Sequence, residues 1–362
     1  MGFSSLQLRA IGLAAHGVSP EQLRDAVAAL LERGQDVSAD QVIGLLESER
    51  GTAPDTECDR LAAWLSQAGA AVALPGGDDY PAHLSPLWPE LGAPAWLFVR
   101  ARNAHVPAGP AVAVVGSRRP TLEGRRVARE LGRELAVNGI TVVSGLAKGI
   151  DQAAHLGALD VEGATVAVLG TGFDVDYPRG DIHLRKAIEA SGGLVTEHVP
   201  GTPPRKHTFL WRNRIVAGLA DATVVVEGGA QSGSLHTARM AAAQGRDVWA
   251  VPGPLQAPNS QAPLALIRDG ANVVTQLHDV VGAVGAPRLE LPGQEARGSV
   301  PPGNGLDHDA QTVHRLLSAV PSTPSAIAVA AGLPVPAVSA ILADLADHGL
   351  AAVTPQGVVA VH

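Results

Sequence analysis

Between residues 111 and 275, short apolar runs alternate with longer stretches in which apolar and polar residues recur at helical spacing. The apolar runs are rich in β-branched residues and almost free of charge, which is typical of parallel strands buried on both faces. They occupy residues 111–115, 141–145, 165–170, 193–197, 222–227, 247–251 and 272–275. The stretches between them, such as LEGRRVARELGRELAVNG and SLHTARMAAAQG, predict amphipathic helices. This alternation predicts an α/β fold with a doubly wound, mostly parallel sheet.

The flanking regions follow other patterns. Leucine and valine recur at helical spacing over residues 6–47, with Ser19-Pro20-Glu21 and Ser38 as helix-start signals. The end of the chain reads as helices followed by a small hairpin, which resembles a winged helix. We therefore predict an N-terminal helical (SAM-like) domain, a sheet domain with its entry connector, a Pro/Gly-rich linker and a winged-helix-like module. Their predicted ranges are 1–74, 75–282, 283–305 and 306–362, and Trp88, Trp96 and Phe98 of the connector are expected to pack the first domain onto the second.

Four glycine- and serine-rich turns follow the predicted strands. Ligands of doubly wound sheets bind beyond the carboxyl ends of the strands, where helix-opening turns offer free backbone N–H groups. Small residues let phosphate oxygens approach these groups, and hydroxyls and cations add further donors. The turns therefore predict an anion-binding ledge. Its candidate residues are Gly116, Ser117, Arg118, Ser144, Gly145, Lys148, Gly170, Ser232, Gly233 and Ser234.

A basic segment, which we expect to be a loop, lies between the fourth and fifth predicted strands. Residues 205–214 contain Arg205, Lys206, Arg212 and Arg214 without a carboxylate, and Phe209 and Trp211 stand among these charges. Cations hold phosphates and aromatic faces accept any base, so such a cluster suits single-stranded nucleic acid. The alternative is a solvated surface loop whose tryptophan packs on the core. The position of the segment beside the ledge favours binding, with Lys206, Arg212 and Arg214 supplying charge and Phe209 contacting bases.

Composition narrows the possible functions. The 362 residues carry a formal net charge of −8, but the acidic excess lies outside residues 111–280. A local cation cluster can therefore still bind phosphates, because charges beyond about 8 Å are screened at physiological salt. The single cysteine, Cys58, excludes an intramolecular disulfide and fits a reducing cytoplasm. No apolar run reaches the length of a membrane span and no signal peptide is recognisable, so we expect a cytoplasmic protein without membrane contact.

The sequence gives little sign of a catalytic or metal site. The GxGxxG and GxxxxGK[ST] patterns are absent, which argues against NAD binding and a P-loop. Asp151 is expected to cap a helix start and Glu227 to orient the cationic segment, while His155 and His236 are expected to be core or rim residues. We predict no catalytic residue, metal or cofactor.

Six motifs, in this order and spacing, resemble the DNA-processing protein A (DprA, also called Smf) family. They are AVAVVGSRRPTLEG, VVSGLAKGIDQAAH, TVAVLGTGFDVDYP, GTPPRKHTFLWRNRIVAGLADATVVVE, SGSLHTA and GRDVWAVPG. The resemblance implies an extended Rossmann-like domain that binds single-stranded DNA and dimerises. It also implies a recombination mediator, not an enzyme, that protects incoming DNA and helps load the RecA recombinase during natural transformation. The family motifs fall on Gly116 to Arg118, on Ser144 to Ala147 with Gly149 to Asp151, and on Lys206, Phe209, Arg212, Asn213 and Arg214.

The chain departs from the family pattern in the basic segment, where Leu210 and Trp211 follow Phe209 and a proline is missing. Trp211 is therefore either a further base platform or part of the core. Two other functions remain open. A phosphate ledge also suits an enzyme of the phosphoribohydrolase type, although its Pro-Gly-Gly-x-Gly-Thr turn is replaced by residues 228–235. A regulator of duplex DNA is disfavoured, because the predicted recognition helix at 334–348 lacks Lys and Arg. We expect weak duplex binding at most.

Overall fold

The computed structural model describes residues 3–285, apart from short gaps at 19, 35–36, 90–91, 102–105 and 107. Beyond residue 285 it describes only isolated positions and the strands at 351–354 and 357–360. The chain divides into two units, Met1–Leu289 and Glu290–His362.

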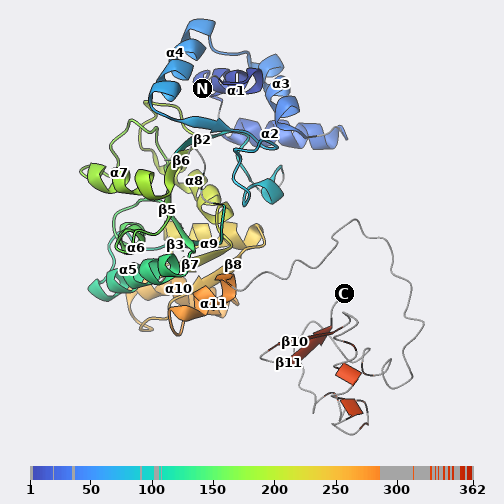
Figure 1. The fold of residues 1–362 in the computed structure, drawn as a ribbon, viewed down its shortest axis with the longest axis vertical. Coiled ribbons are helices and arrows are strands. Elements are labelled where there is room, and N and C mark those ends of the chain that lie inside the picture. Colours follow the sequence, from blue (N-terminus) through green and yellow to red (C-terminus); the bar gives the residue numbers. More distant parts are fainter. Residues whose placement is uncertain are drawn as a thin grey trace. The chain divides into compact units, whose positions relative to one another are not determined.

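The first unit is built on one nine-stranded sheet with the strand order β1-β2-β6-β5-β4-β3-β7-β8-β9 (Figure 1). The strands are β1 (Ala71–Ala73), β2 (Leu97–Arg100), β3 (Ala111–Val115), β4 (Thr141–Ser144), β5 (Thr165–Val168), β6 (Gly193–Thr196), β7 (Ala222–Val225), β8 (Asp247–Ala250) and β9 (Asn272–Val273). Strands β3 to β9 run parallel, with registers such as Val112 opposite Val142 and Ala222. The predicted α/β fold and its seven parallel strands are confirmed, although most strands end one or two residues earlier than predicted.

Two strands at one side of the sheet, β1 and β2, were not predicted. β2 pairs antiparallel with β6, and β1 pairs antiparallel with β2. They have three and four residues and flank the Pro-rich connector, so neither shows the alternation that identified the others. β1 thus joins the sheet from within the range expected for the N-terminal domain, and the sheet is mixed at this edge.

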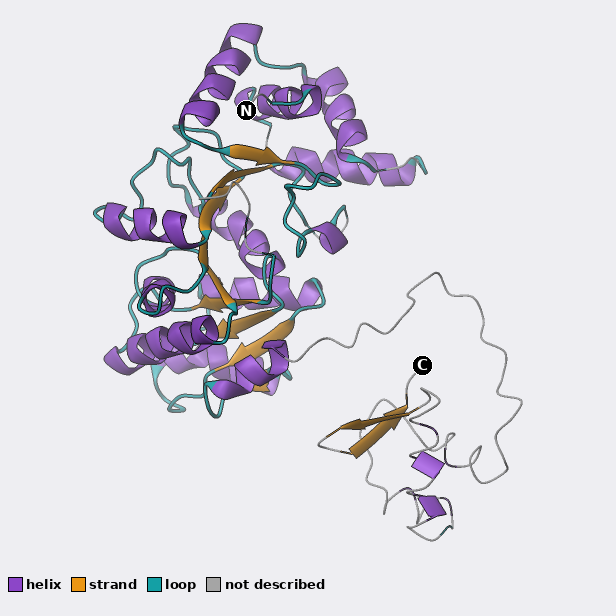
Figure 2. Ribbon diagram, viewed as in Figure 1, coloured by secondary structure: helices purple, strands orange, loops and turns teal. Residues whose placement is uncertain are grey.

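Helices cover both faces of the sheet (Figure 2). The helices of the sheet region are α5 (Leu122–Val137), α6 (Ile150–Leu159), α7 (Ile182–Ser191), α8 (Lys206–Gly218), α9 (Gly233–Ala243), α10 (Gln261–Arg268) and α11 (His278–Gly285). One core cluster combines α5, α6 and α11 with the sheet, and another combines α8, α9 and α10 with it. Because the β-branched strands are buried on both faces, the loops at their carboxyl ends are left to form a site.

Four helices precede the sheet: α1 (Ser5–Ala15), α2 (Pro20–Glu32), α3 (Ala39–Arg50) and α4 (Asp55–Gln67). Ser38 caps α3 as predicted, while Ser19 lies outside the described residues. The connector packs these helices onto the sheet as expected. Trp88 Nε1 donates to the Val37 carbonyl at 2.8 Å, and Trp96 and Phe98 are buried in the same core cluster as α1 and α3.

In the second unit, β10 (Ala351–Thr354) pairs antiparallel with β11 (Gly357–Ala360), and Val313, Ile327, Val338, Leu342 and Leu345 form a buried cluster. The predicted linker and most of the predicted recognition helix lie outside the described residues, so the winged helix remains a prediction. Among the helices described in either unit, none is long and apolar enough to cross a membrane.

Candidate functional site

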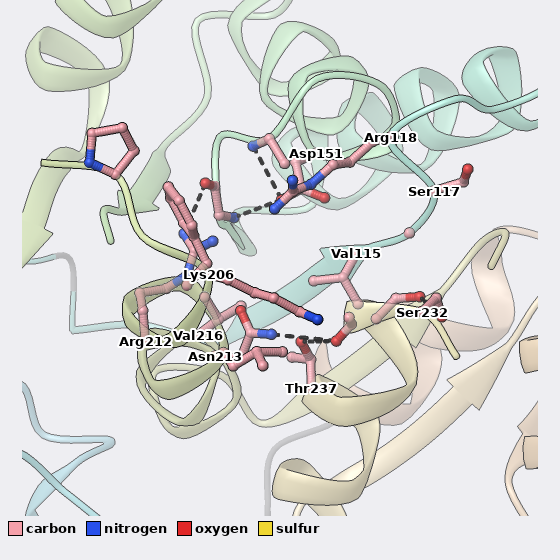
Figure 3. Close-up of a pocket in the computed structure, with 18 of the residues that line it drawn as sticks. Val115, Ser117, Arg118, Asp151, Lys206, Arg212, Asn213, Val216, Ser232 and Thr237 are labelled. Carbon is pink, nitrogen blue, oxygen red and sulfur yellow. Dashed lines mark hydrogen bonds between the residues drawn. The ribbon is translucent and has the colours of Figure 1, made fainter. Parts of the chain in front are cut away.

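A cavity of about 660 Å³ opens at the carboxyl ends of β3 and β4, between these strands and the first turns of α8 and α9 (Figure 3). It brings together most of the residues predicted from the turns and the basic segment. Those that line it are Gly116, Ser117, Arg118, Gly145, Lys206, Phe209, Arg212, Asn213, Ser232, Gly233 and Ser234. Some turn residues lie 60 or more residues from the basic segment in the sequence. The parallel topology brings them together at the carboxyl ends of the strands.

The basic segment is the start of a helix, whereas a loop was expected. Arg205 is the last extended residue, and α8 begins at Lys206 with no acidic residue in its first turn. Arg205 and Lys206 are both exposed, and Lys206 points into the cavity (Figure 3). Without an anion nearby, cations beside the free N–H groups of a helix start are unfavourable, because the side chains and the N–H groups both carry positive charge. An anion in the cavity would satisfy both.

Arg118 and Phe209 lie close together in the cavity lining. The Phe209 ring contacts the Tyr177 ring with centroids 4.9 Å apart, and the Arg118 guanidinium lies 5.7 Å from the Phe209 ring centroid. Arg118 is exposed, and the described residues include no carboxylate paired with it or with Lys206. Tyr177 was not singled out from the sequence, although it lies within the motif TVAVLGTGFDVDYP that follows the third predicted strand. The ring pair offers an aromatic surface beside two free cations.

The turn before α9 completes the site with small polar groups. Ser232 Oγ caps the helix by accepting from Leu235 N at 3.3 Å and lies 2.8 Å from Ser234 Oγ. Asn213 Nδ2 donates to the Gly233 carbonyl at 3.3 Å and so ties α8 to this turn.

At Gly116 an added Cβ would lie 2.6 Å from Ile150 Cγ1 and 2.8 Å from the Glu227 carbonyl, so only glycine fits. Gln231 and Thr237, which also line the cavity, were missed because nothing in their local sequence marks them.

Four predicted residues lie outside the lining, and three of them, Ser144, Lys148 and Gly170, belong to the turns. Ser144 is buried and its hydroxyl donates to the Val114 carbonyl at 2.6 Å, so it is not a free donor. An added Cβ at Gly170 would lie 2.6 Å from Phe209 Cδ1, so this glycine makes room for the ring. Lys148 is exposed on the same turn as Gly145. Ser144 and Gly170 therefore shape the site from beneath it.

The prediction that Arg214 is an unpaired cation is wrong. Its side chain is 8% exposed, and its Nη2 donates to Glu197 Oε1 at 2.5 Å. The guanidinium also lies 4.9 Å from the Trp211 ring centroid. Glu197 follows β6 and lies outside the segment whose charges were counted, which is why the pairing was missed. Arg214 therefore does not supply charge to the cavity surface.

Arg212 is also buried, contrary to its expected role as a surface cation. Its Nη1 donates to the Gly145 carbonyl at 2.7 Å and to the Val168 carbonyl, and this joins α8 to the turn after β4 and to the end of β5. Burial lowers the pKa of the guanidinium to about 10, so it is charged at neutral pH. Its part in the site is to hold these turns in place.

The buried acid Asp151 has a structural role. Asp151 Oδ2 accepts from Gly145 N and Ala147 N at 3.1 and 3.3 Å, so it holds the turn before α6, while the cap position itself is Gly149. Burial raises the pKa of the Asp151 carboxyl. The described residues contain no group of three or more His, Cys, Asp or Glu side chains placed to hold a metal ion.

Glu227 was predicted to orient the basic segment, but its side chain bonds elsewhere. It accepts from Thr121 N at 2.9 Å, from Thr121 Oγ1 at 2.5 Å and from Asn259 Nδ2 at 3.1 Å, so it fixes the start of α5. His155 is buried as predicted, and burial lowers its pKa to about 3. His236 is half-buried on α9 and lies outside this cavity.

The chain matches known proteins over most of its length. The sequence profile of the family described as DNA recombination-mediator protein A matches residues 71–285. A DNA processing protein DprA of Mycobacterium tuberculosis is 41% identical over 322 residues, which cover 84% of this chain and 81% of that protein. Protein Smf of Escherichia coli is 37% identical over 304 residues, which cover 82% of this chain and 79% of that protein.

Solved structures agree with the sequence comparison. DNA processing protein A from Streptococcus pneumoniae superposes with a TM-score of 0.61 at 31% identity and covers 78% of this chain and 99% of its own. DNA processing protein A from Helicobacter pylori, solved to describe its single-stranded DNA binding mode, has a TM-score of 0.52 at 26% identity. It covers 59% of this chain and 94% of its own. Family profile, relatives and fold together show that this chain belongs to the DNA recombination-mediator protein A (DprA/Smf) family.

Proposed function

We propose that the chain binds single-stranded DNA without sequence preference in the cavity at the ends of β3 and β4. Family membership and the single-stranded DNA binding mode described for the Helicobacter pylori relative support this. The observation that carries it is the convergence of Arg118 and Lys206, two exposed cations without a carboxylate partner among the described residues, on one cavity beside the Phe209 ring. Phosphates contribute affinity and the ring accepts any base.

The division of labour differs from the sequence prediction. Arg118, Lys206 and Arg205 hold phosphates, together with the backbone N–H groups at the starts of α8 and α9. Phe209 and Tyr177 contact bases, and Arg212, Asn213, Ser144 and Gly170 keep the walls in place. Gly116, Ser117 and the Ser232–Ser234 turn let the strand approach the backbone closely. Arg214 takes no direct part.

The proposal predicts a loss of DNA affinity on removal of either free cation. Arg118→Ala and Lys206→Ala should each weaken binding of oligo-dT by about tenfold or more, because a hydrogen bond to a charged group contributes about 1.5–3 kcal/mol. Each should also reduce the slope of log Kd against log salt by about 0.7. Fluorescence anisotropy over a range of salt concentrations measures both. Arg125→Ala, which removes an exposed arginine of α5 outside the cavity, is the matched control. Unchanged affinity in both cavity variants would refute the site.

We further propose that the protein acts as a homodimer in the cytoplasm, protects incoming single strands and helps RecA replace other proteins on them during transformation. Light scattering should give twice the chain mass.

RecA filament assembly on DNA coated with single-strand-binding protein should accelerate with the wild type but not with Lys206→Ala, because the mediator must first hold the strand. Equal acceleration by both proteins would contradict this order of events. Release of free base from AMP would instead favour the phosphoribohydrolase alternative.

A further inference from the structure

Helix α8 separates the proposed DNA cavity from a second, larger cavity of about 880 Å³. Lys206, Phe209 and Asn213 line the first cavity, whereas His207 and Trp211, which lie four residues apart, line the second. The end of α1 and the side chains of His236 and Met240 on α9 close its other sides. One helix thus presents Lys206 and Phe209 to one cavity and His207 and Trp211 to the other.

The side chains that line the second cavity suit a neutral, flat ligand. Its lining includes the indoles of Trp96 and Trp211 and the imidazoles of His198, His207 and His236. Burial lowers the pKa of His198, so this imidazole is neutral at pH 7 and offers one donor and one acceptor. The carboxylate in the lining, Glu197, is already neutralised by Arg214. Arg205 is the single arginine or lysine in this lining, so the cavity offers phosphate fewer cations than the first cavity does.

The two cavities adjoin. Arg205 and Leu210 line both of them, and the Leu210 side chain is 37% exposed although it is large and apolar. A chain with phosphates at Arg205 and Lys206 can therefore direct a base across the first turns of α8. The size suits a base with its sugar, because small-ligand pockets span about 300–1,000 Å³.

We propose that the second cavity is a nucleobase subsite for the same single strand, in which Trp211 provides the stacking face and the histidines meet the base edge. This rests on the proposed binding of single-stranded DNA in the first cavity. It also assigns Trp211, which the sequence left open between a base platform and the core, to the DNA surface.

A comparison of two strands tests the subsite: oligo-dT and an abasic chain with the same number of phosphates. Trp211→Ala should weaken oligo-dT binding by about tenfold, since stacking contributes about 1–3 kcal/mol per base, and should leave the abasic chain unaffected. His207→Ala should weaken oligo-dT binding by about threefold, as expected for one lost hydrogen bond. Because Trp211 also packs on Arg214, the exposed His207 keeps the test available if Trp211→Ala does not fold. His183→Ala, an exposed histidine of α7 outside both cavities, should bind like the wild type.

The outcomes separate this subsite from the proposed function. If Lys206→Ala loses oligo-dT binding while His207→Ala and Trp211→Ala keep it, the subsite is overturned and the first cavity stands. Equal losses on both strands would mean that the second cavity only shapes the phosphate site, and would also overturn it. A change of oligomeric state in His207→Ala with unaltered DNA binding would identify a contact between copies instead. If the wild type does not bind oligo-dT, both proposals fail.

Discussion

At the scale of single residues, the spatial partner of a charge decides its role. Lys206 and Arg214 belong to the same basic segment, yet Lys206 is exposed at the cavity and Arg214 is buried against Glu197. Lys206 is exposed because it is the first residue of α8, whereas Arg214 lies further along the helix and packs against the Trp211 ring. Counting carboxylates within a segment could not distinguish them, because Glu197 comes from the end of another strand.

The buried pair predicts a large and asymmetric effect on stability. Arg214→Met should lower the free energy of unfolding by about 3–5 kcal/mol, because it leaves the Glu197 carboxylate buried without its partner. The double variant with Glu197→Gln should recover most of this loss, because no uncompensated charge then remains. Urea denaturation measures both. Arg126→Met is the control, since its side chain is 58% exposed and surface ion pairs contribute about 0–1 kcal/mol. Equal losses in Arg214→Met and Arg126→Met would contradict the buried-pair interpretation.

At the scale of elements, hydrophobic pattern predicted the strands that are buried on both faces and failed where other forces dominate. Strands such as β3 and β7 contain only small or β-branched residues, so their sequence alone identifies them. β1 and β2 are too short to show a period; β2 is held by pairing to β6, and β1 by pairing to β2. Helix α8 was taken for a loop because its buried face includes Arg212 and Arg214, which a hydrophobic pattern counts as solvent-exposed.

The sequence located the turns of the site but not the turn residues that face the cavity. The turns after β3, β4 and β7 were located because parallel strands bring their carboxyl ends to one edge. The contacts that decide which turn residues face the cavity are not local. Ser144 bonds to β3, Gly170 accommodates Phe209, and Glu227 holds the start of α5. These assignments needed the packing of elements against each other.

At the scale of the whole molecule, the first unit contains everything that the proposed DNA site requires. The cavity, its aromatic surface, the turn that carries Arg118 and the helix that carries Lys206 all lie within Met1–Leu289. Among the described residues, three buried clusters belong to this unit, and the second unit has a separate small cluster around Val338 and Leu342. Each unit therefore buries its own core.

A chain shortened to residues 1–289 should accordingly fold and bind oligo-dT with the same Kd and salt slope as the full chain, within about twofold. The residues removed carry an acidic excess, so long-range repulsion of DNA should if anything decrease at low salt. Anisotropy titrations at matched salt, with circular dichroism to verify folding, measure this. A tenfold loss of affinity in a folded shortened chain would show that residues 290–362 contribute directly to the DNA surface. The single-strand site would then extend beyond the sheet edge on which Arg118 and Lys206 converge.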